Sequence, residues 1–280
     1  MRKSSDGLVI KEYAVGESDK LLTVLTSDGG KILISAKGVR SMKSKNMSVC
    51  RLFSYANFEY YEKNGRYWLA TATSIESFFS LNESIEALAL ASYVVDIVNE
   101  ISGEGVPDEL LLRATLNTLY AIGKGLRPRE LIKGAFEFFA AAHSGFLGTL
   151  SVCERCEKAP EGSFYLDVMN GSLLCSECLK AKGLAAYDPE TELSIDRFAT
   201  KNVLLPLTKE VLMAINYVIT APIQRLFSFN LTDIEDLRLF SRAGEIYLEN
   251  HLERGFETLK FYYSVADLEL PEPKTERNAK

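Results

Sequence analysis

The first eighty residues alternate between apolar and polar positions at the short period of β-strands. Five such runs are separated by polar or glycine-containing turns, and the last two are joined across Asn64-Gly65, a strong two-residue hairpin signal. The runs are "GLVIKEYAV", "KLLTVLT", "KILISAKGV", "YANFEYYEK" and "RYWLATATSIESF". Five short strands in about 75 residues predict a small closed or half-closed barrel. An OB-type barrel has this size and strand number, and an SH3-like barrel fits the pattern nearly as well.

From residue 80 onward the apolar positions recur at helical spacing over wide faces, which predicts helices that pack together as a bundle. Capping residues and first-turn prolines mark the expected starts, and glycine or proline marks the expected ends. The expected starts are the capping box of Ser80 and Glu83, Pro107, Pro128, Thr208 and the capping box of Thr232 and Glu235, and the expected ends are Gly123, Gly145 and Pro222.

The composition is that of an ordinary soluble globular protein. Of the 280 residues, 47% are apolar and 25% charged, and no apolar run reaches the roughly 18 residues of a spanning helix. The start, "MRKSSDGLVIKEY", lacks the apolar core of a secretory signal, so we expect a cytoplasmic location. Only two histidines occur, His143 and His251, and the P-loop, GxGxxG and HExxH patterns are absent. We therefore expect no enzymatic activity.

Four of the five cysteines form two CxxC pairs, Cys153 with Cys156 and Cys175 with Cys178, separated by eighteen residues. This spacing is typical of a four-cysteine structural zinc site, with room for a β-hairpin between the pairs. Four protein ligands leave no open position, so the zinc is expected to be structural. Two redox pairs or four unrelated buried cysteines are less favoured, because no βαβ pattern surrounds either pair. The fifth, Cys50, is expected to be a small buried hydrophobe.

These patterns predict an α+β multidomain fold in which an N-terminal OB-fold β-barrel is followed by an α-helical bundle carrying an inserted four-cysteine zinc finger. The expected boundaries are 1–79 for the barrel, 80–152 and 184–263 for the two parts of the helical domain, 153–183 for the zinc finger and 264–280 for a polar, proline-containing, disordered tail.

The charge is distributed unevenly along the chain. The net charge is −6, yet residues 29–58 hold six basic residues and no acidic one. A single-strand binder uses such a loop on a barrel to follow phosphates, with aromatic side chains as stacking platforms. A solvated loop is the alternative, and charge alone does not decide between them. The basic residues are Lys31, Lys37, Arg40, Lys43, Lys45 and Arg51, and the nearby aromatic candidates are Phe53, Tyr55, Phe58, Tyr60, Tyr61, Tyr67 and Trp68, many of which must face the core because they alternate along strands.

Several segments occur in an order that is similar to one known family. They are "GLVIKEYAVGESDKLLTVLTSDGGKILISAKGVR", with an acidic turn before Asp19 and Lys20, the cysteine flanks "HSGFLGTLSVCERC" and "NGSLLCSEC", and the C-terminal "LPLTKEVLMAINYVITAPIQRLFSFNLT" and "YLENHLERGFETLKFY". In this order and spacing, over roughly residues 7 to 263, the chain resembles the RecO family of bacterial DNA repair and recombination mediators.

The resemblance implies an OB-fold and a helical domain with a zinc finger set within it. It implies binding of single- and double-stranded DNA, annealing of complementary strands, partnership with RecR in the RecFOR pathway, and help in loading RecA onto DNA coated with single-strand binding protein. The protein would associate with the nucleoid when acting on DNA. Some members dock the acidic tail of single-strand binding protein on the helical domain; Arg225, Arg238 and Arg242 are candidates here, and a solvated helix face explains them equally well. Because some members lack the cysteines, the zinc would be structural.

The sequence therefore predicts a non-enzymatic, DNA-binding recombination mediator with no membrane partner and no small-molecule substrate. Its predicted phosphate contacts are Lys37, Arg40, Lys43, Lys45 and Arg51, with Lys31 and Arg66 as further candidates, and its predicted metal ligands are Cys153, Cys156, Cys175 and Cys178. Two alternatives stay open: a zinc-containing protein-interaction scaffold without direct DNA binding, and a metal-dependent nuclease that uses acidic residues. The net charge of −6 is low for a DNA-binding protein.

Overall fold

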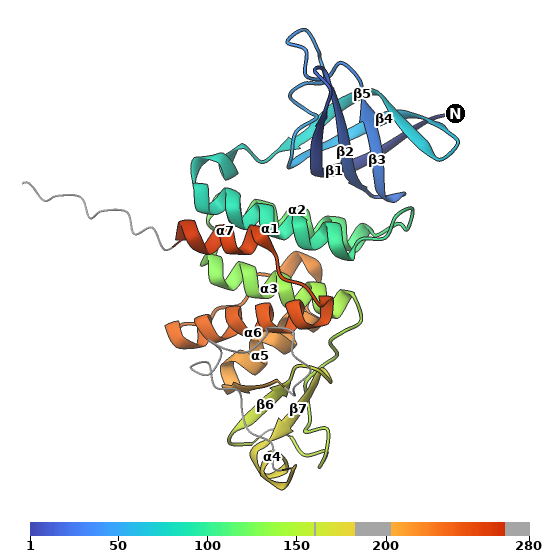
Figure 1. The fold of residues 1–280 in the computed structure, drawn as a ribbon. Helices are drawn as coiled ribbons and strands as arrows, with labels where there is room; N and C mark the ends of the chain where they lie inside the picture. The colour runs from blue at the N-terminus through green and yellow to red at the C-terminus, as the bar shows by residue number, and fades with distance from the viewer. Residues whose placement is uncertain (160, 183–202, 267–280) are drawn as a thin grey trace, which may run out of the picture.

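The chain forms a β-barrel, a layered helical body and a small four-cysteine module, and the barrel and the module lie at opposite ends of the molecule (Figure 1). The computed structural model describes residues 1–159, 161–182 and 203–266. The predicted α+β fold, with a barrel followed by helices and a cysteine cluster between helices, is confirmed.

Five strands close the barrel in the order β1-β2-β3-β5-β4, with β4 paired back to β1. They are β1 (Arg2–Val15), β2 (Asp19–Thr26), β3 (Gly30–Ala36), β4 (Ser54–Lys63) and β5 (Arg66–Ser77). The β3 and β5 strands pair in parallel, and the other neighbours are antiparallel. This five-stranded Greek-key arrangement is the OB-fold, so the structure decides for the OB-type barrel over the SH3-like one.

The turn between β4 and β5 is the two-residue hairpin that the sequence predicts. Asn64 has a φ of 52° and Gly65 a φ of 69°, and two successive positive φ values define the type I′ turn that matches the twist of a hairpin. The alternation of β3 is equally clear: Ile32 and Ile34 are buried in the barrel, whereas Leu33 between them is 45% exposed. This alternation presents one face of the strand to solvent.

Two short 3-10 helices and six longer helices make up the described part of the helical body. They are η1 (Phe79–Glu83), α1 (Ile85–Ile101), α2 (Glu109–Lys124), α3 (Arg129–His143), α5 (Lys209–Thr220), η3 (Ile223–Arg225), α6 (Ile234–Leu252) and α7 (Glu257–Ala266). The predicted cap Thr208 is confirmed, since its hydroxyl accepts a hydrogen bond from the N–H of Val211. The predicted ends at Gly145 and Pro222 are also confirmed, because α3 and α5 stop just before them.

Three predicted helix starts are wrong by one to four residues. Helix α1 is capped by Ser84 rather than Ser80, and η1 occupies the residues between them. Helix α2 is capped by Asp108 rather than begun by Pro107, and α6 is capped by Asp233 rather than by Thr232. In each case the side-chain oxygen of the observed cap accepts at least one free N–H of the first turn.

Two further boundaries shift for backbone reasons. Helix α2 continues through Gly123 and ends at Gly125, whose φ of 58° provides the left-handed cap. Pro128 lies one position before α3, at the N-cap, rather than inside its first turn. Both corrections leave the number and order of the predicted helices unchanged.

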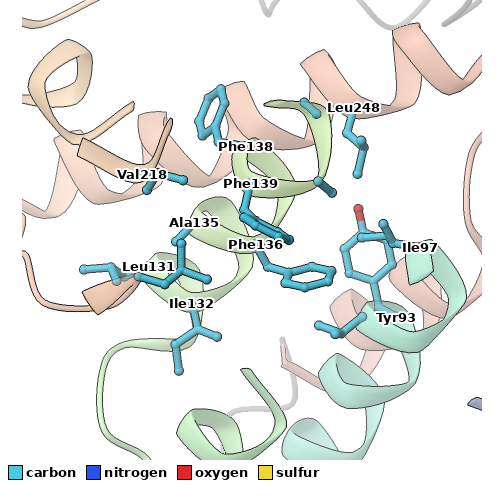
Figure 2. Packing of buried hydrophobic residues seen from close by; sticks show 14 of the residues in the cluster. Tyr93, Ile97, Leu131, Ile132, Ala135, Phe136, Phe138, Phe139, Val218 and Leu248 are labelled. Atoms are coloured by element: carbon cyan, nitrogen blue, oxygen red, sulfur yellow. The ribbon is translucent and has the colours of Figure 1, made fainter. Parts of the chain in front are cut away.

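Helix α3 is the centre of the helical body and contacts α1, α2, α5 and α6. Figure 2 shows its Phe136, Phe138 and Phe139 packed among side chains of the neighbouring helices, including Tyr93 of α1 and Leu248 of α6. The helix also buries charge, as described below. Within the described residues, no helix is both long and apolar enough to cross a membrane.

The cysteine module is a three-stranded sheet with one short helix. Its parts are β6 (Phe164–Asp167), β7 (Ser172–Cys175), α4 (Ser176–Lys182) and β8 (Leu204–Leu207), with the sheet order β7-β6-β8. The predicted hairpin between the two cysteine pairs is confirmed as β6–β7. The β8 strand was not predicted, because four residues directly before a helix cap show no strand period.

Some predicted segments fall beyond the described residues. Most of the first stretch of the second helical part, residues 184–202, lies there, as do residues 267–280 of the predicted disordered tail. Residues 264–266, which the tail prediction included, form the last positions of α7.

Candidate nucleic-acid interface and four-cysteine cluster

A groove of about 900 Å³ lies on the outer face of the barrel, over β1, β2, β3 and the beginning of β5. Four of its lining residues form one row across the strands, because Tyr13 pairs with Leu21, Leu21 with Ser35, and Ser35 with Trp68. Aromatic side chains therefore stand at both ends of the row. The strand 2–3 face is where OB-folds bind oligonucleotides.

The adjacent row contains Lys11, Thr23 and Leu33, which also line the groove. The Lys11 ammonium lies 5.2 Å from the centre of the Tyr13 ring. Tyr13 is 47% exposed to solvent. A cation beside an exposed ring combines phosphate attraction with a stacking surface. Neither Lys11 nor Tyr13 was among the predicted site residues, although their two-residue spacing in "GLVIKEYAV" places them on one face of a strand.

One wall of the groove belongs to the helical body. The segment after α1 is fastened to β3, since Lys31 donates its N–H to the Gly103 carbonyl (3.1 Å) and its ammonium to the Asn99 carbonyl (2.5 Å). At Gly30 the φ is 62°, and a Cβ there would lie 2.1 Å from the carbonyl oxygen of Val106. Only glycine permits this approach, so barrel and helical body meet here in a fixed contact.

The basic stretch forms the long connection from β3 to β4 and is fastened by the turn between β1 and β2. The carboxylate of Asp19 accepts the N–H of Gly38, and the Arg40 guanidinium donates to the Gly16 carbonyl (2.9 Å). The Lys20 ammonium donates to the carbonyl of Cys50 (2.9 Å). Asp19 and Lys20, which follow the acidic turn of the family-like segment and begin β2, therefore anchor this basic loop, residues 37–53.

Apolar residues of the same loop cover the end of the barrel. Val39, Val49 and Cys50 are buried in the barrel core, and burial raises the pKa of the Cys50 thiol to about 12. Cys50 is thus the buried small hydrophobe that the sequence predicts. The loop backbone is therefore held by these hydrogen bonds and by its buried apolar side chains, whereas its basic side chains are exposed.

The predicted phosphate contacts do not all lie together. Lys37, Arg40, Lys43 and Lys45 are exposed on the basic loop, and their assignment to DNA stays a prediction. Lys31 and Arg66 line the groove, but the Lys31 ammonium is engaged by Asn99. Arg51 lines a different hollow, of about 270 Å³, between the barrel and α1.

The predicted aromatic residues divide in the same way. Phe53, Phe58 and Tyr60 are buried and are not available to stack on bases. Tyr67 and Trp68 line the groove. Tyr55 is half-buried against the helical core. Tyr61 is half-exposed on β4 and is not among the lining residues, but it pairs directly with Trp68 of β5 at the edge of the groove.

The four predicted metal ligands meet at the other end of the molecule. The Sγ atoms of Cys153, Cys156, Cys175 and Cys178 all lie within 4.8 Å of one another, and those of Cys156 and Cys175 are 3.9 Å apart. A tetrahedral zinc with Zn–S bonds of about 2.3 Å places its sulfurs about 3.8 Å apart. The donor set and its spacing therefore fit one soft, tetrahedral ion.

The backbone around Cys153 favours a thiolate. Burial raises the pKa of this thiol, but N–H groups of Cys156, Cys175 and Arg155 point at the sulfur and together lower the pKa to about 6. The Cys175 N–H lies 3.4 Å from the Cys153 Sγ. A thiolate at neutral pH is the form that binds a metal.

A second groove, of about 460 Å³, lies on the helical body between the end of α2 and η3. Its apolar rim includes Tyr120 and Leu126, each 51% exposed, and the Arg127 side chain crosses it to donate to the Phe227 carbonyl (3.0 Å). Arg225 directly follows the lining residue Gln224.

The other two predicted tail-binding arginines lie elsewhere. Arg238 of α6 pairs with Glu235 at 2.9 Å, and neither it nor Arg242 is among the described residues that line this groove. The two histidines have structural partners: His143 is 2.6 Å from the Asp108 carboxylate, and His251 is 2.8 Å from the Val168 carbonyl of the cysteine module.

Comparison with known proteins agrees with this architecture along nearly the whole chain. Residues 1–78 match the family model "Recombination protein O N terminal", and residues 82–260 match "Recombination protein O C terminal". The DNA repair protein RecO of Acetivibrio thermocellus is 29% identical over 257 residues, covering 92% of this chain and 94% of the relative. RecO of Pelotomaculum thermopropionicum is 27% identical over 257 residues, with 92% of each chain covered. The barrel, the helical body and the cysteine module thus fall within one matched family, and the chain belongs to the RecO family of DNA repair proteins.

Proposed function

We propose that this protein binds single- and double-stranded DNA on its barrel, anneals complementary strands and, with RecR, helps load RecA onto DNA coated with single-strand binding protein. One observation carries the proposal. The outward residues of β3 lead from Leu33 and Ser35 in the groove to Lys37 at the start of the basic loop. An aromatic groove and an exposed cationic loop are therefore continuous on one OB-fold.

The proposed action is electrostatic and needs no bond chemistry. Lys37, Arg40, Lys43 and Lys45 neutralise phosphates and release counterions, which is the main source of affinity in sequence-independent binding. Two strands held on the same cationic surface repel each other less, so complementary bases meet more often. The surface contacts backbone rather than base edges, and recognition is independent of sequence.

We further propose that the four cysteines hold one structural zinc ion. The sulfur spacing fits such an ion, and four thiolate ligands complete its tetrahedral shell. The ion would fix the module whose turn contacts His251 of α6. The nuclease alternative has no particular observation in its favour, because the group with metal-ligating spacing among the described residues is these cysteines.

The groove beside α2 is our proposed site for the acidic tail of single-strand binding protein. It combines exposed apolar side chains, Tyr120 and Leu126, with the cations Arg127 and Arg225. An acidic peptide with apolar residues would place its side chains in the groove and its carboxylates beside the arginines. Of the three predicted arginines, Arg225 alone adjoins this groove.

A salt titration of single-strand DNA binding tests the main proposal. We compare the wild type with the variant Lys37→Ala, Arg40→Ala, Lys43→Ala, Lys45→Ala. Log affinity decreases with log salt, and the steepness of this decrease is reduced by about 0.7 for each phosphate that the protein no longer neutralises on a single strand. We expect a smaller slope and weaker binding for the variant.

A matched control removes four exposed cations of the helical body and the cysteine module. Its substitutions are Lys180→Ala, Lys209→Ala, Arg238→Ala and Lys260→Ala. This control has the same change in net charge, so a slope equal to that of the wild type assigns the effect to the loop. If the loop variant and the wild type had the same affinity and slope, the protein-interaction scaffold would be the better description.

A further inference from the structure

A small hollow on the helical body lies between α5 and the segment that leads into α6. Its volume is about 260 Å³, below the range of about 300–1,000 Å³ that is typical of small-molecule sites, so it admits one or two side chains. Its lining is apolar: Met213 of α5 is 62% exposed, and the centres of the Tyr217 and Phe229 rings lie 5.3 Å apart. A thioether beside aromatic rings adapts well to an unbranched apolar side chain.

The charged residues among the described lining of this hollow are acidic. Glu210 is exposed at the start of α5, and Asp236 of α6 accepts a hydrogen bond from the Thr208 hydroxyl (2.7 Å). The cap and first turn of α6 add two more carboxylates. Lys209 and Arg238 are near in sequence, but neither lines the hollow, and Arg238 pairs with a carboxylate of its own helix. The hollow is therefore apolar inside and negative at its rim.

The basic loop carries a projection of the opposite character. Met42 is 91% exposed, and Arg40, Lys43 and Lys45 flank it in the chain. A backbone hydrogen bond of 2.8 Å closes the turn of residues 41–44, so this segment is preformed and loses little conformational freedom on binding. An exposed apolar side chain among three cations is the counterpart of an apolar hollow with an acidic rim.

The distribution of charge indicates where the occupant of the hollow comes from. Residues 1–79 hold twelve basic and eight acidic residues, a net charge of +4, so the rest of the chain carries −10. Residues 183–202 and 267–280 are unsuited to an acidic rim, because each segment has more acidic than basic residues. The molecule's own basic loop is too distant, because α1 and α2 contact the barrel whereas α5 and α6 pack against α3, beyond them (Figure 1). The basic loop of a second molecule meets neither obstacle.

We propose that two copies of this protein associate head to tail, with Met42 of one copy in the hollow beside Met213 of the other. The cations of the loop then face Glu210 and Asp236. One buried side chain and a few partly solvated ion pairs make a weak, transient contact. The contact uses the loop that is proposed to bind phosphates, so DNA and the second copy compete for it. This competition, unlike the docking itself, rests on the proposed DNA binding.

A mixing experiment tests the contact, read by sedimentation velocity of the full chain at low salt. Met42→Ser removes the projection, and Met213→Lys places a cation in the hollow; each alone weakens self-association roughly tenfold or more. Both residues are exposed, so neither substitution disturbs the core. Each variant keeps the element that the other lacks. An equimolar mixture therefore regains association and stops at the pair, because the loop and the hollow left over in that pair are both defective.

The controls keep the chemistry and change the place, or the reverse. Met169→Lys alters a methionine of the cysteine module that is 45% exposed and outside the hollow, and it associates like the wild type. Met42→Leu keeps an apolar projection and also associates. Raising the salt concentration weakens association of the wild type, because the ion pairs at the rim are screened.

The outcomes separate this inference from the proposed function. If the wild type stays monomeric at every concentration, or the mixture of variants does not associate, the head-to-tail contact is wrong. If Met213→Lys associates like the wild type while Met42→Ser does not, the loop docks elsewhere and the hollow is wrongly assigned.

Oligothymidylate tests the competition. It should return assemblies of the wild type to single molecules, and binding of the oligonucleotide without dispersal overturns the competition. DNA binding by a protein that never associates leaves the proposed function standing and overturns this inference. Association through Met42 and Met213 in a protein that binds no DNA does the opposite.

Discussion

The carboxylate of Asp19 accepts a hydrogen bond from the backbone N–H of Gly38, with 2.8 Å between Oδ1 and N. This contact joins the turn between β1 and β2 to the first residues of the basic loop, and Lys37 lies beside the same carboxylate. An acidic side chain therefore organises the most basic segment of the protein. The contact holds the loop backbone while leaving the lysine side chains exposed.

The Asp19 contact has a defined pH dependence. The Gly38 N–H, followed by the Ser18 hydroxyl, lowers the pKa of Asp19 below its ordinary value of 3.8. A lowered folded-state pKa means that the contact is complete above pH 3.8 and disappears as the pH falls through the folded value. We expect the Gly38 amide resonance to titrate with a midpoint below 3.8, as measured by NMR. A midpoint at or above 3.8 would contradict the contact, and the solvent-exposed Glu17 in the same turn serves as the internal comparison.

Lys31 is expected to stabilise the fold more than it binds DNA. Its ammonium donates to the Asn99 carbonyl and joins the barrel to α1, so Lys31→Ala should lower the free energy of unfolding by about 1–2 kcal/mol. The measurement is denaturant unfolding combined with the salt slope of DNA binding. In the control, Lys37→Ala, stability is unchanged and the slope falls by about 0.7. If Lys31→Ala had wild-type stability and a reduced salt slope, Lys31 would contact phosphates rather than stabilise the fold.

The buried charges of α3 should tolerate joint replacement better than single replacement. Lys133 is 1% exposed and Glu137 is fully buried, and their charged atoms are 2.9 Å apart. Glu245 of α6 lies 3.0 Å from the same ammonium, and the Tyr93 hydroxyl donates to Glu137. Lys133→Met removes the cation that faces both carboxylates and should cost about 3–5 kcal/mol.

The double variant Lys133→Met, Glu137→Leu removes the most buried carboxylate together with the cation. We expect a smaller loss of stability than in Lys133→Met alone, measured by thermal and denaturant unfolding. Equal losses in the two variants would show that the ammonium and the Glu137 carboxylate are not coupled. Glu245 keeps its contact with Tyr263 in both variants.

Metal removal should loosen one end of the molecule and leave the other unchanged. We expect about one zinc per chain by metal analysis, and a chelator should raise hydrogen exchange in β6, β7 and at the Val168 contact with His251. Exchange in the barrel strands should stay the same. Cys175→Ser should lose the ion, whereas Cys50→Ala, which alters a cysteine of the barrel core, should keep it. A folded preparation with far less than one zinc per chain would contradict the assignment.

The groove beside α2 should bind an acidic peptide. Arg225→Glu and Tyr120→Ala should each weaken binding of the C-terminal peptide of single-strand binding protein by about tenfold or more, by fluorescence anisotropy. Arg238→Glu, on α6 and outside the groove, is the matched charge reversal. Equal effects of Arg225→Glu and Arg238→Glu would show only the change in net charge and would move the peptide site elsewhere.

The barrel was largely predictable because its determinants are local. Strand alternation and the Asn64-Gly65 turn specify strands and one hairpin without reference to the rest of the chain. The choice between OB-type and SH3-like barrels was not local, since it depends on the parallel pairing of Ile34 with Tyr67. The four cysteines were equally visible, because two short turns bring their sulfurs together.

Other features depended on partners that sequence spacing does not reveal. Lys31 looked like its basic neighbours, but the end of α1 meets it and binds its ammonium. Arg51 belongs to the same charge run as Lys45, yet its position just before β4 places it in a separate hollow. Helix starts shifted where two capping residues were adjacent, as with Thr232 and Asp233, because the carboxylate accepts two N–H groups there.

The pairing of β8 with β6 has a consequence for synthesis on the ribosome. Cys178 precedes Leu204 by more than twenty positions in the chain, so both cysteine pairs emerge before the strand that completes their sheet. The hairpin and its cysteines can therefore assemble first. The sheet can join the helical body only after β8 and the adjoining α5 have been synthesised. Docking of this module is therefore a late step in the folding of the newly made chain.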